Sequence, residues 1–138
     1  KYENAWQVVD GATPAAEGWF IIDLGDVYTF DNIVTAWDMG AYATDYELLV
    51  SEDGEQYTSV SHTTDWTTAN TEVSGIFTVG KQDITLTSAV KARYVRLRRL
   101  DSKRTNYASI RSFEVNPLRI REMLLVERMI LRMMKILL

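Results

Sequence analysis

The feature that most constrains the fold of this chain is the spacing of its apolar stretches. Across residues 19–116, short runs of aromatic and β-branched residues alternate with clusters of Gly, Asp, Asn, Ser and Thr, and helical periodicity is absent. Short strands separated at regular intervals by turn residues are typical of an all-β sandwich. We therefore expect about eight strands, at residues 19–24, 32–38, 45–51, 56–61, 76–79, 82–87, 92–100 and 109–115.

A β-hairpin is predicted around Asp53-Gly54, which separates two extended runs. An Asp-Gly pair readily adopts the positive φ angles of a tight hairpin turn. In the first arm, Tyr46, Leu48 and Val50 share one face and should point into the core, because side chains alternate along a strand.

Residues 19–25 (WFIIDLG) are apolar on both faces of the expected strand. This pattern predicts a central strand that is covered on each side. Asp23 interrupts the run, and we expect its carboxylate to accept hydrogen bonds from the backbone of the following Gly25-Asp26 turn.

The 138 residues divide into two parts of different composition. Residues 1–116 carry 10 Lys and Arg against 17 Asp and Glu, whereas residues 117–138 carry 5 against 2. With 46% hydrophobic residues, the chain is long enough for one well-filled core and too short for two ordinary domains. We expect one domain over residues 1–116 and a separate tail over residues 117–138.

The tail has no glycine or aromatic residue and contains four of the five methionines. Arg121, Arg128, Arg132 and Lys135 fall near one helical face, which predicts a basic amphipathic helix with a wide apolar side. That side could pack on the sandwich, drive self-association or bind a membrane interface. We favour a fourth alternative, a non-native translation of the end of an excerpted gene.

Composition argues against nucleic-acid binding and against catalysis. The acidic body repels phosphate backbones, and the arginines of residues 93–99 alternate with apolar residues as on the solvent side of a strand. The chain has no cysteine and one histidine, His62, which we take for a loop residue. With no cysteine near it and no spaced second histidine, neither a zinc site nor a nucleophile–histidine pair can be assembled from the usual residue types. No carboxylate pair stands out for glycosidase chemistry.

Six short motifs appear in one order across residues 10–116. They are Asp10-Gly11, residues 19–25 (WFIIDLG), Trp37-Asp38 with Tyr42-Ala43 and Asp45-Tyr46, residues 51–54 (SEDG), residues 92–97 (ARYVRL), and residues 107–110 (YASI) before 113–115 (FEV). In these motifs the chain resembles the discoidin, or coagulation factor 5/8 type C, domains, and among them the family 32 carbohydrate-binding modules. The resemblance implies an antiparallel jelly-roll sandwich of the galactose-binding-domain-like type, which binds with loops at one end. It also implies an extracellular or cell-surface location, as part of a larger protein.

Strand parity predicts which loops lie together. If successive strands alternate in direction, loops 39–44, 62–75 and 101–108 share one end of the sandwich, and the opposite end holds only short links. The shared end collects aromatic rings and planar polar groups, which are the groups that sugars need.

By the resemblance, Asp38, Tyr42 and Tyr107 are the first candidates for carbohydrate contact. The shared loops add Trp66, Arg104 and Asn106 as further candidates. Each has a structural alternative: Asp38 could cap the 39–44 turn, Trp66 could cover the sandwich end, and Tyr107 could belong to the core. Trp37 and Tyr46 lie on expected strands and are assigned to the core.

The resemblance also implies a possible structural Ca²⁺, held by the Asp of the Asp-Gly motif and an acid near the last strand. Asp10 matches the first position. Ser112 stands where the family often has a glutamate, with Glu114 two residues on as a substitute ligand. Because calcium needs six to eight oxygens, losing a carboxylate would weaken the site.

Three functions remain open: glycan binding, phospholipid or protein adhesion through the same loops, and a structural spacer. We favour a non-catalytic carbohydrate-binding module that targets a larger protein, such as a glycoside hydrolase, to a glycan. The ligand could be a β-glucan, an amino-sugar polymer or a galactoside. Membrane binding by the sandwich is disfavoured, because loop 101–108 carries no exposed Leu, Phe or Met.

Overall fold

The computed structural model describes residues 6–9, 19–67, 69–104, 107–118, 129 and 132–134. Its strands are β1 (Trp6–Val9), β2 (Trp19–Asp38), β3 (Asp45–Ser51), β4 (Thr58–Thr63), β5 (Asn70–Ser74), β6 (Phe77–Asp101) and β7 (Tyr107–Pro117). Every strand pairing is antiparallel. No helix in the described part of the chain is long and apolar enough to cross a membrane.

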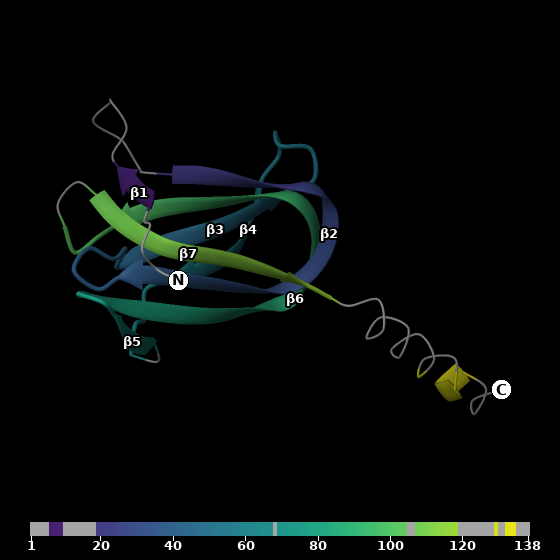
Figure 1. Ribbon diagram of the computed structural model, residues 1–138. Coiled ribbons are helices and arrows are strands. Elements are labelled where there is room, and N and C mark those ends of the chain that lie inside the picture. Colours follow the sequence, from purple (N-terminus) through teal and green to yellow (C-terminus); the bar gives the residue numbers. More distant parts are fainter. Residues whose placement is uncertain are drawn as a thin grey trace.

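The strands form one continuous sheet in the order β1-β7-β2-β6-β3-β4, with β5 paired to β6. The long strands β2 and β6 bend together, so that the sheet folds over into a sandwich (Figure 1). The first layer contains β2 residues 19–24, β6 residues 92–101, β3 and β4. The second layer contains β1, β7, β2 residues 32–38, β6 residues 77–87 and β5.

The corner between the layers lies where the β2–β6 register breaks, on both sides of Phe30. Gly25 has φ +84° near this corner, a conformation that L side chains rarely adopt. The Asp23 carboxylate accepts the Gly25 N–H at 2.8 Å, as the sequence predicts. Strands predicted as separate at 19–24 and 32–38 are therefore one bent strand, and those at 76–79, 82–87 and 92–100 are another.

The core fills the space between the layers. Fully buried side chains include Trp37, Tyr46 and Leu48, as the alternation of residues predicted. The Tyr46 hydroxyl lies 3.0 Å from Thr35 Oγ1 and donates to Gln82 Oε1, so this polar atom is satisfied inside the core. Burial raises the pKa of Tyr46 above its usual value.

The β3–β4 hairpin is present, but its connection is longer than a tight turn. Val50 pairs with Thr58, leaving residues 52–57 between the strands. Only Gly54 has positive φ there, at +81°. The Asp53 side chain instead accepts the backbone N–H groups of Glu55 and Gln56, at 2.8 and 3.0 Å, and so organises the loop.

The expectation that residues 19–25 form a centrally placed, doubly covered strand is wrong. Among the described residues, this part of β2 pairs only with β6 and forms an edge of the first layer. Trp19 and Ile21 point outward, with 54% and 41% of their surface exposed, while Phe20 packs inward against the core. The apolar side chains of one face thus pack on the core, whereas those of the other face form an exposed surface.

A short N-terminal strand and part of a C-terminal helix flank the main strands. β1 pairs with β7 and extends the second layer at its edge, where no strand was predicted. In the tail, Met129 and residues 132–134 are helical and carry exposed methionines. The rest of residues 119–138 lies outside the described residues, so the two-part division of the chain stays a prediction.

Candidate functional site

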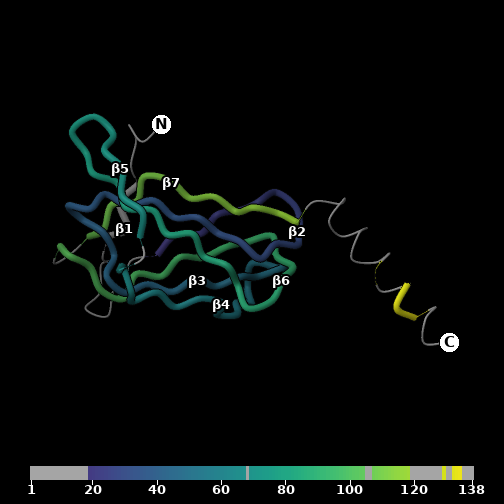
Figure 2. The backbone as a smooth tube through the Cα atoms, turned by 90° about the horizontal axis from the view of Figure 1, so that it is seen from below, coloured from purple at the N-terminus to yellow at the C-terminus, as the bar shows by residue number. Residues whose placement is uncertain are grey.

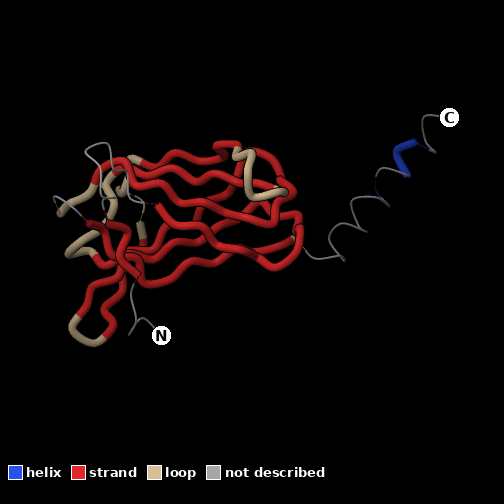
Figure 3. The backbone as a smooth tube through the Cα atoms, turned by 90° about the horizontal axis from the view of Figure 1, so that it is seen from above, coloured by secondary structure: helices blue, strands red, loops and turns tan. Residues whose placement is uncertain are grey.

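The connections at one end of the sandwich lie together, as strand parity predicts. Asp38 at the end of β2 pairs with Val79 near the start of β6, and Asp45 at the start of β3 pairs with Asp101 at the end of β6. Figure 3 shows most of the loops gathered at the end away from the C-terminus. We call this surface, formed by residues 39–44, 64–67, 69, 101–104 and 107, the loop end. The predicted loop 62–75 is partly strand, because β4 runs to Thr63 and β5 occupies Asn70–Ser74.

Loop 39–44 is fixed to its neighbours through backbone hydrogen bonds. The N–H groups of Met39, Thr44, Lys103 and Ser109 donate to carbonyls of Thr78, Asp101, Tyr42 and Ala41, at 2.9, 3.1, 3.0 and 2.6 Å respectively. These bonds join the loop to β6, to the 101–107 connection and to β7. These hydrogen bonds therefore hold the loop in a defined conformation.

Two of the predicted aromatic residues, Tyr42 and Trp66, meet at the loop end. Their ring centroids are 4.6 Å apart with an interplanar angle of 57°. Trp66 is held by its Nε1–H, which donates to Ala43 O at 3.0 Å, and by an edge contact with buried Trp37 at 6.4 Å. Both rings are only partly buried, so each keeps surface for a ligand. Trp66 covers the sandwich end, as the structural alternative held, and also contributes to an open aromatic surface.

Gly80 on β6 lies directly against the side chains of Met39 and Trp66. A Cβ at this position would collide with Met39 Sδ and would lie 3.2 Å from Trp66 Cζ3. The glycine lets the β6 backbone approach the two side chains closely. The sequence shows Gly80 inside a strand, but nothing in the sequence says which side chains it admits.

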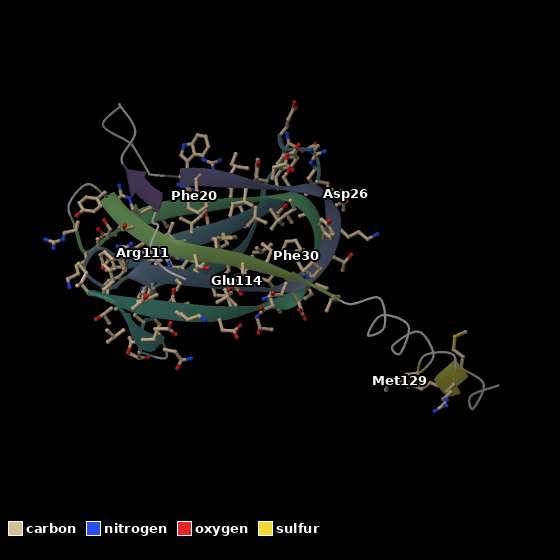
Figure 4. All side chains as sticks on the ribbon, viewed as in Figure 1. Phe20, Asp26, Phe30, Arg111, Glu114 and Met129 are labelled. Carbon is tan, nitrogen blue, oxygen red and sulfur yellow. The ribbon has the colours of Figure 1, made fainter. Side chains whose placement is uncertain are left out.

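Asp38 is engaged within the protein. Its Oδ2 accepts Arg111 Nη2 at 2.9 Å and its Oδ1 accepts the Gly40 N–H at 2.8 Å. The Arg111 guanidinium also lies 3.7 Å from the ring centroid of Phe77, which flanks the turn of the β5–β6 hairpin. Figure 4 shows Arg111 on β7 near the loop end. Of the two predicted roles of Asp38, the structure shows the capping of the 39–44 turn.

The remaining predicted contacts differ in what the structure shows. Arg104 is exposed and its Nε donates to Gly40 O at 3.0 Å, while neighbouring Lys103 donates to Met39 O at 3.2 Å. Tyr107 is half-buried at the start of β7. Asn106 lies outside the described residues.

His62 is a strand residue, so its assignment to a loop is wrong. It pairs with Glu47 across the β3–β4 ladder, and its Nε2 lies 2.6 Å from Asp45 Oδ1. Both side chains are on the surface close to the loop end. This contact was not predicted because β4 continues two residues beyond the predicted strand.

No metal site is assembled within the described residues. No three His, Asp or Glu side chains gather there closely enough to hold an ion. Glu114 is exposed on β7, and Asp10 lies outside the described part of the chain. The predicted structural Ca²⁺ stays a prediction.

An open pocket lies at the opposite end, beside the 52–57 loop, and its lining includes Ser51, Asp53 and Lys91. One Asp53 carboxylate oxygen is already occupied by the Ser51 hydroxyl and two backbone N–H groups. These hydrogen bonds hold the pKa of Asp53 below its usual value. The pocket has no partly exposed pair of stacked rings among its lining residues, so the loop end is the better sugar-binding candidate.

Comparison with solved structures identifies several related modules. Chitosan-binding module 1 of a chitosanase/glucanase from Paenibacillus sp. IK-5 matches with a TM-score of 0.63 at 28% identity, over 84% of this chain and 78% of the module. Chitosan-binding module 2 of the same enzyme, solved with chitotriose, has a TM-score of 0.60 at 29% identity, over 80% and 76%. CBM32-1 of a family 31 glycoside hydrolase from Clostridium perfringens shares the fold, with a TM-score of 0.56 at 22% identity, over 82% and 76%.

No curated protein sequence matches this chain. The family model of the F5/8 type C domain matches residues 1–113, which include most of the sandwich. The motif order, the sandwich and this match agree, and the chain belongs to the F5/8 type C domain family.

Proposed function

We propose that this domain is a non-catalytic carbohydrate-binding module whose loop end holds a glycan. The observation that carries the proposal is the Tyr42–Trp66 pair, two partly exposed rings fixed at 4.6 Å on a hydrogen-bonded loop. A pyranose presents an apolar C–H face that packs on such rings. Similarity to the two chitosan-binding modules, at 28% and 29% identity, supports the same function here.

The same similarity favours an amino-sugar polymer over a galactoside as the ligand. Chitosan carries ammonium groups, and carboxylates pair well with such groups in partly desolvated surroundings. Asp65 and Asp101 are exposed at the loop end, and each accepts hydrogen bonds from the residues that follow it in its own loop. Either carboxylate keeps acceptor capacity for an ammonium group.

The domain would act by anchoring a larger, extracellular protein to its glycan. Arg104, Asn106 and Tyr107 are proposed as further ligand contacts from the 101–107 connection. We propose that Asp38 mainly holds loop 39–44 in place. Each of its carboxylate oxygens already accepts a hydrogen bond, one from Arg111 and one from Gly40, which leaves less acceptor capacity for a sugar.

Calorimetry with chitosan oligomers, cello-oligosaccharides and galactosides tests the proposal. Tyr42→Ala and Trp66→Ala should each weaken binding by about 1–3 kcal/mol, the scale of a lost aromatic anchor. Tyr28→Ala is the matched control, because Tyr28 is an exposed aromatic residue near the corner between the layers. Failure of every glycan to bind would favour the spacer function, and full affinity in both loop-end variants would place the site elsewhere.

A further inference from the structure

The outer face of the first layer carries an unusual row of cations and rings. Side chains that alternate with the buried Val95 and Leu97 on β6 point outward, and they include Arg96. In register on either side of Arg96 are Ile21 on β2 and Leu49 on β3. Figure 2 shows β3, β4 and β6 running side by side in this layer.

Arg96 lies between two aromatic rings. Its Cζ is 4.9 Å from the ring centroid of Trp19 and 5.9 Å from that of Tyr57. Stacking of this kind stabilises a guanidinium and restricts its orientation, so the cation is held in one place before any ligand arrives.

The two neighbouring arginines on this face are already paired with carboxylates. Arg93 forms a two-pronged contact with Asp23, at 2.8 and 3.0 Å, and Arg98 lies 3.3 Å from Glu47. Arg96 Nε has no hydrogen-bond partner among the described residues, and its guanidinium lies against two aromatic rings. In the middle of the face the guanidinium thus contacts aromatic rings, whereas its two neighbours contact carboxylates.

Two polar atoms beside this charge lack partners as well. Arg96 Nε and Tyr57 Oη are both buried, and neither has a hydrogen-bond partner among the described residues. Buried donors without partners are rare and costly, and flanking apolar residues strengthen any hydrogen bond formed there. An acceptor that reached this position would satisfy both the charge and a donor.

We propose that Trp19, Tyr57 and Arg96 form a second binding site, which takes the carboxylate of an acidic sugar such as a uronate. The guanidinium fork matches a carboxylate with two parallel hydrogen bonds. Trp19 is 54% exposed and offers its free surface to the C–H face of the same sugar ring. One cation between two rings fits a single sugar unit.

A protein partner fits this surface less well. A stable protein interface buries roughly 800 Å² on each side around an apolar centre. On the outer face of the first layer, the exposed large apolar side chains within the described residues are those of Trp19, Ile21 and, at the end of β6, Leu100, which is a small apolar area for such an interface. The site shares no residue with the loop end, so the test of this proposal does not depend on the proposed function.

The test uses oligogalacturonate and its methyl ester, in which each carboxylate is replaced by an uncharged ester group. Calorimetry on the full chain at low salt should show binding of the acid and at least tenfold weaker binding of the ester. In NMR spectra the acid should shift the Trp19 indole N–H signal. A shift of the Trp66 indole in place of Trp19 would assign the acid to the loop end and overturn the second site.

Arg96→Gln should weaken oligogalacturonate binding at least tenfold, and Arg96→Lys, which keeps the charge but lacks the fork, should recover part of the loss. Lys91→Gln removes the same charge from an exposed β6 position outside the site and should bind like the parent chain. Unfolding curves of the variants show whether each is folded. Unchanged affinity in folded Arg96→Gln, or equal binding of acid and ester, would overturn the proposal. Equal binding of a glutamate hexapeptide would replace the sugar by an acidic protein segment.

Discussion

Arg111 and Asp38 join the last strand to the loop end: Arg111 Nη2 lies 2.9 Å from Asp38 Oδ2, across 73 positions of sequence. The arginine side chain is 7% exposed and the aspartate side chain 20%. The second carboxylate oxygen accepts the Gly40 N–H, and the guanidinium stacks on Phe77. One buried cation thus contacts both the carboxylate that caps loop 39–44 and the turn region of the β5–β6 hairpin.

Asp38→Asn should destabilise the domain and disturb loop 39–44, because it leaves a nearly buried guanidinium without its carboxylate. We expect a loss of about 2–3 kcal/mol, somewhat below the cost for a fully buried pair. Urea unfolding of Asp38→Asn, Arg111→Met and the double variant measures the coupling. The double variant should lose at least about 1 kcal/mol less than the sum of the single losses. Strictly additive losses would mean that the contact contributes nothing specific.

Gly80→Ala should displace the side chains that rest on this position. The added methyl would collide with Met39 Sδ and press on Trp66 Cζ3 at 3.2 Å. We expect a stability loss of about 1–2 kcal/mol and weaker glycan binding, since overpacking shifts side chains from their preferred positions. Met39→Ala in the same chain should restore most of the stability. Full glycan affinity in Gly80→Ala would show that the aromatic pair does not need this support.

Asp23 should give the domain an acid-sensitive contact. The Arg93 side chain, helped by the Gly25 N–H, lowers the pKa of Asp23 from 3.8 to about 2. Because the folded-state pKa is the lower one, the contact stabilises the fold above about pH 4 and is lost as the pH falls toward 2. An NMR titration of the Asp23 carboxyl carbon measures this directly. Arg93→Gln should move the midpoint back toward 4, and an unmoved midpoint would refute the ion pair in solution.

The tail should be dispensable for the sandwich. The last backbone hydrogen bond seen in the described sandwich runs from Leu118 N to Thr29 O at 2.8 Å. A chain ending at Leu118 should therefore unfold cooperatively at nearly the same urea concentration, and should stay monomeric in light scattering. The full chain should self-associate, because Met129, Met133 and Met134 are exposed. Loss of cooperative unfolding on truncation would instead show that the tail packs on the sandwich.

The core and the hairpin could be predicted from sequence because both depend on local rules. Alternation alone places Tyr46 and Leu48 inside, and the Asp53-Gly54 pair marks the turn between β3 and β4. The predicted length of this turn was wrong, because the Asp53 side chain organises a six-residue loop through its hydrogen bonds to the backbone. Such bonds compete with the tight turn and are not visible in a residue pattern.

What could not be predicted depends on contacts between distant residues. The prediction that the strand containing Trp19 is covered on both faces was wrong. Trp19 is exposed and lies next to Arg96, a contact that the sequence pattern does not reveal. Asp38 was predicted as a ligand contact from the family resemblance, and its contact with Arg111 was not predicted because the two residues are 73 positions apart. Parity of strand direction succeeded for the loop end because it needs only the order of strands, not their side-chain partners.

The most direct test of the central claim is an NMR titration that follows the tryptophan indole signals. The tightest chitosan or cello-oligosaccharide from the calorimetric panel is added to the chain, with Trp66 and Trp19 assigned by substitution. Binding at the loop end predicts that the Trp66 indole N–H shifts and saturates at the calorimetric Kd, while Trp19 on the outer face does not move. Saturable binding that leaves Trp66 unmoved would contradict the assignment of the glycan site to the loop end.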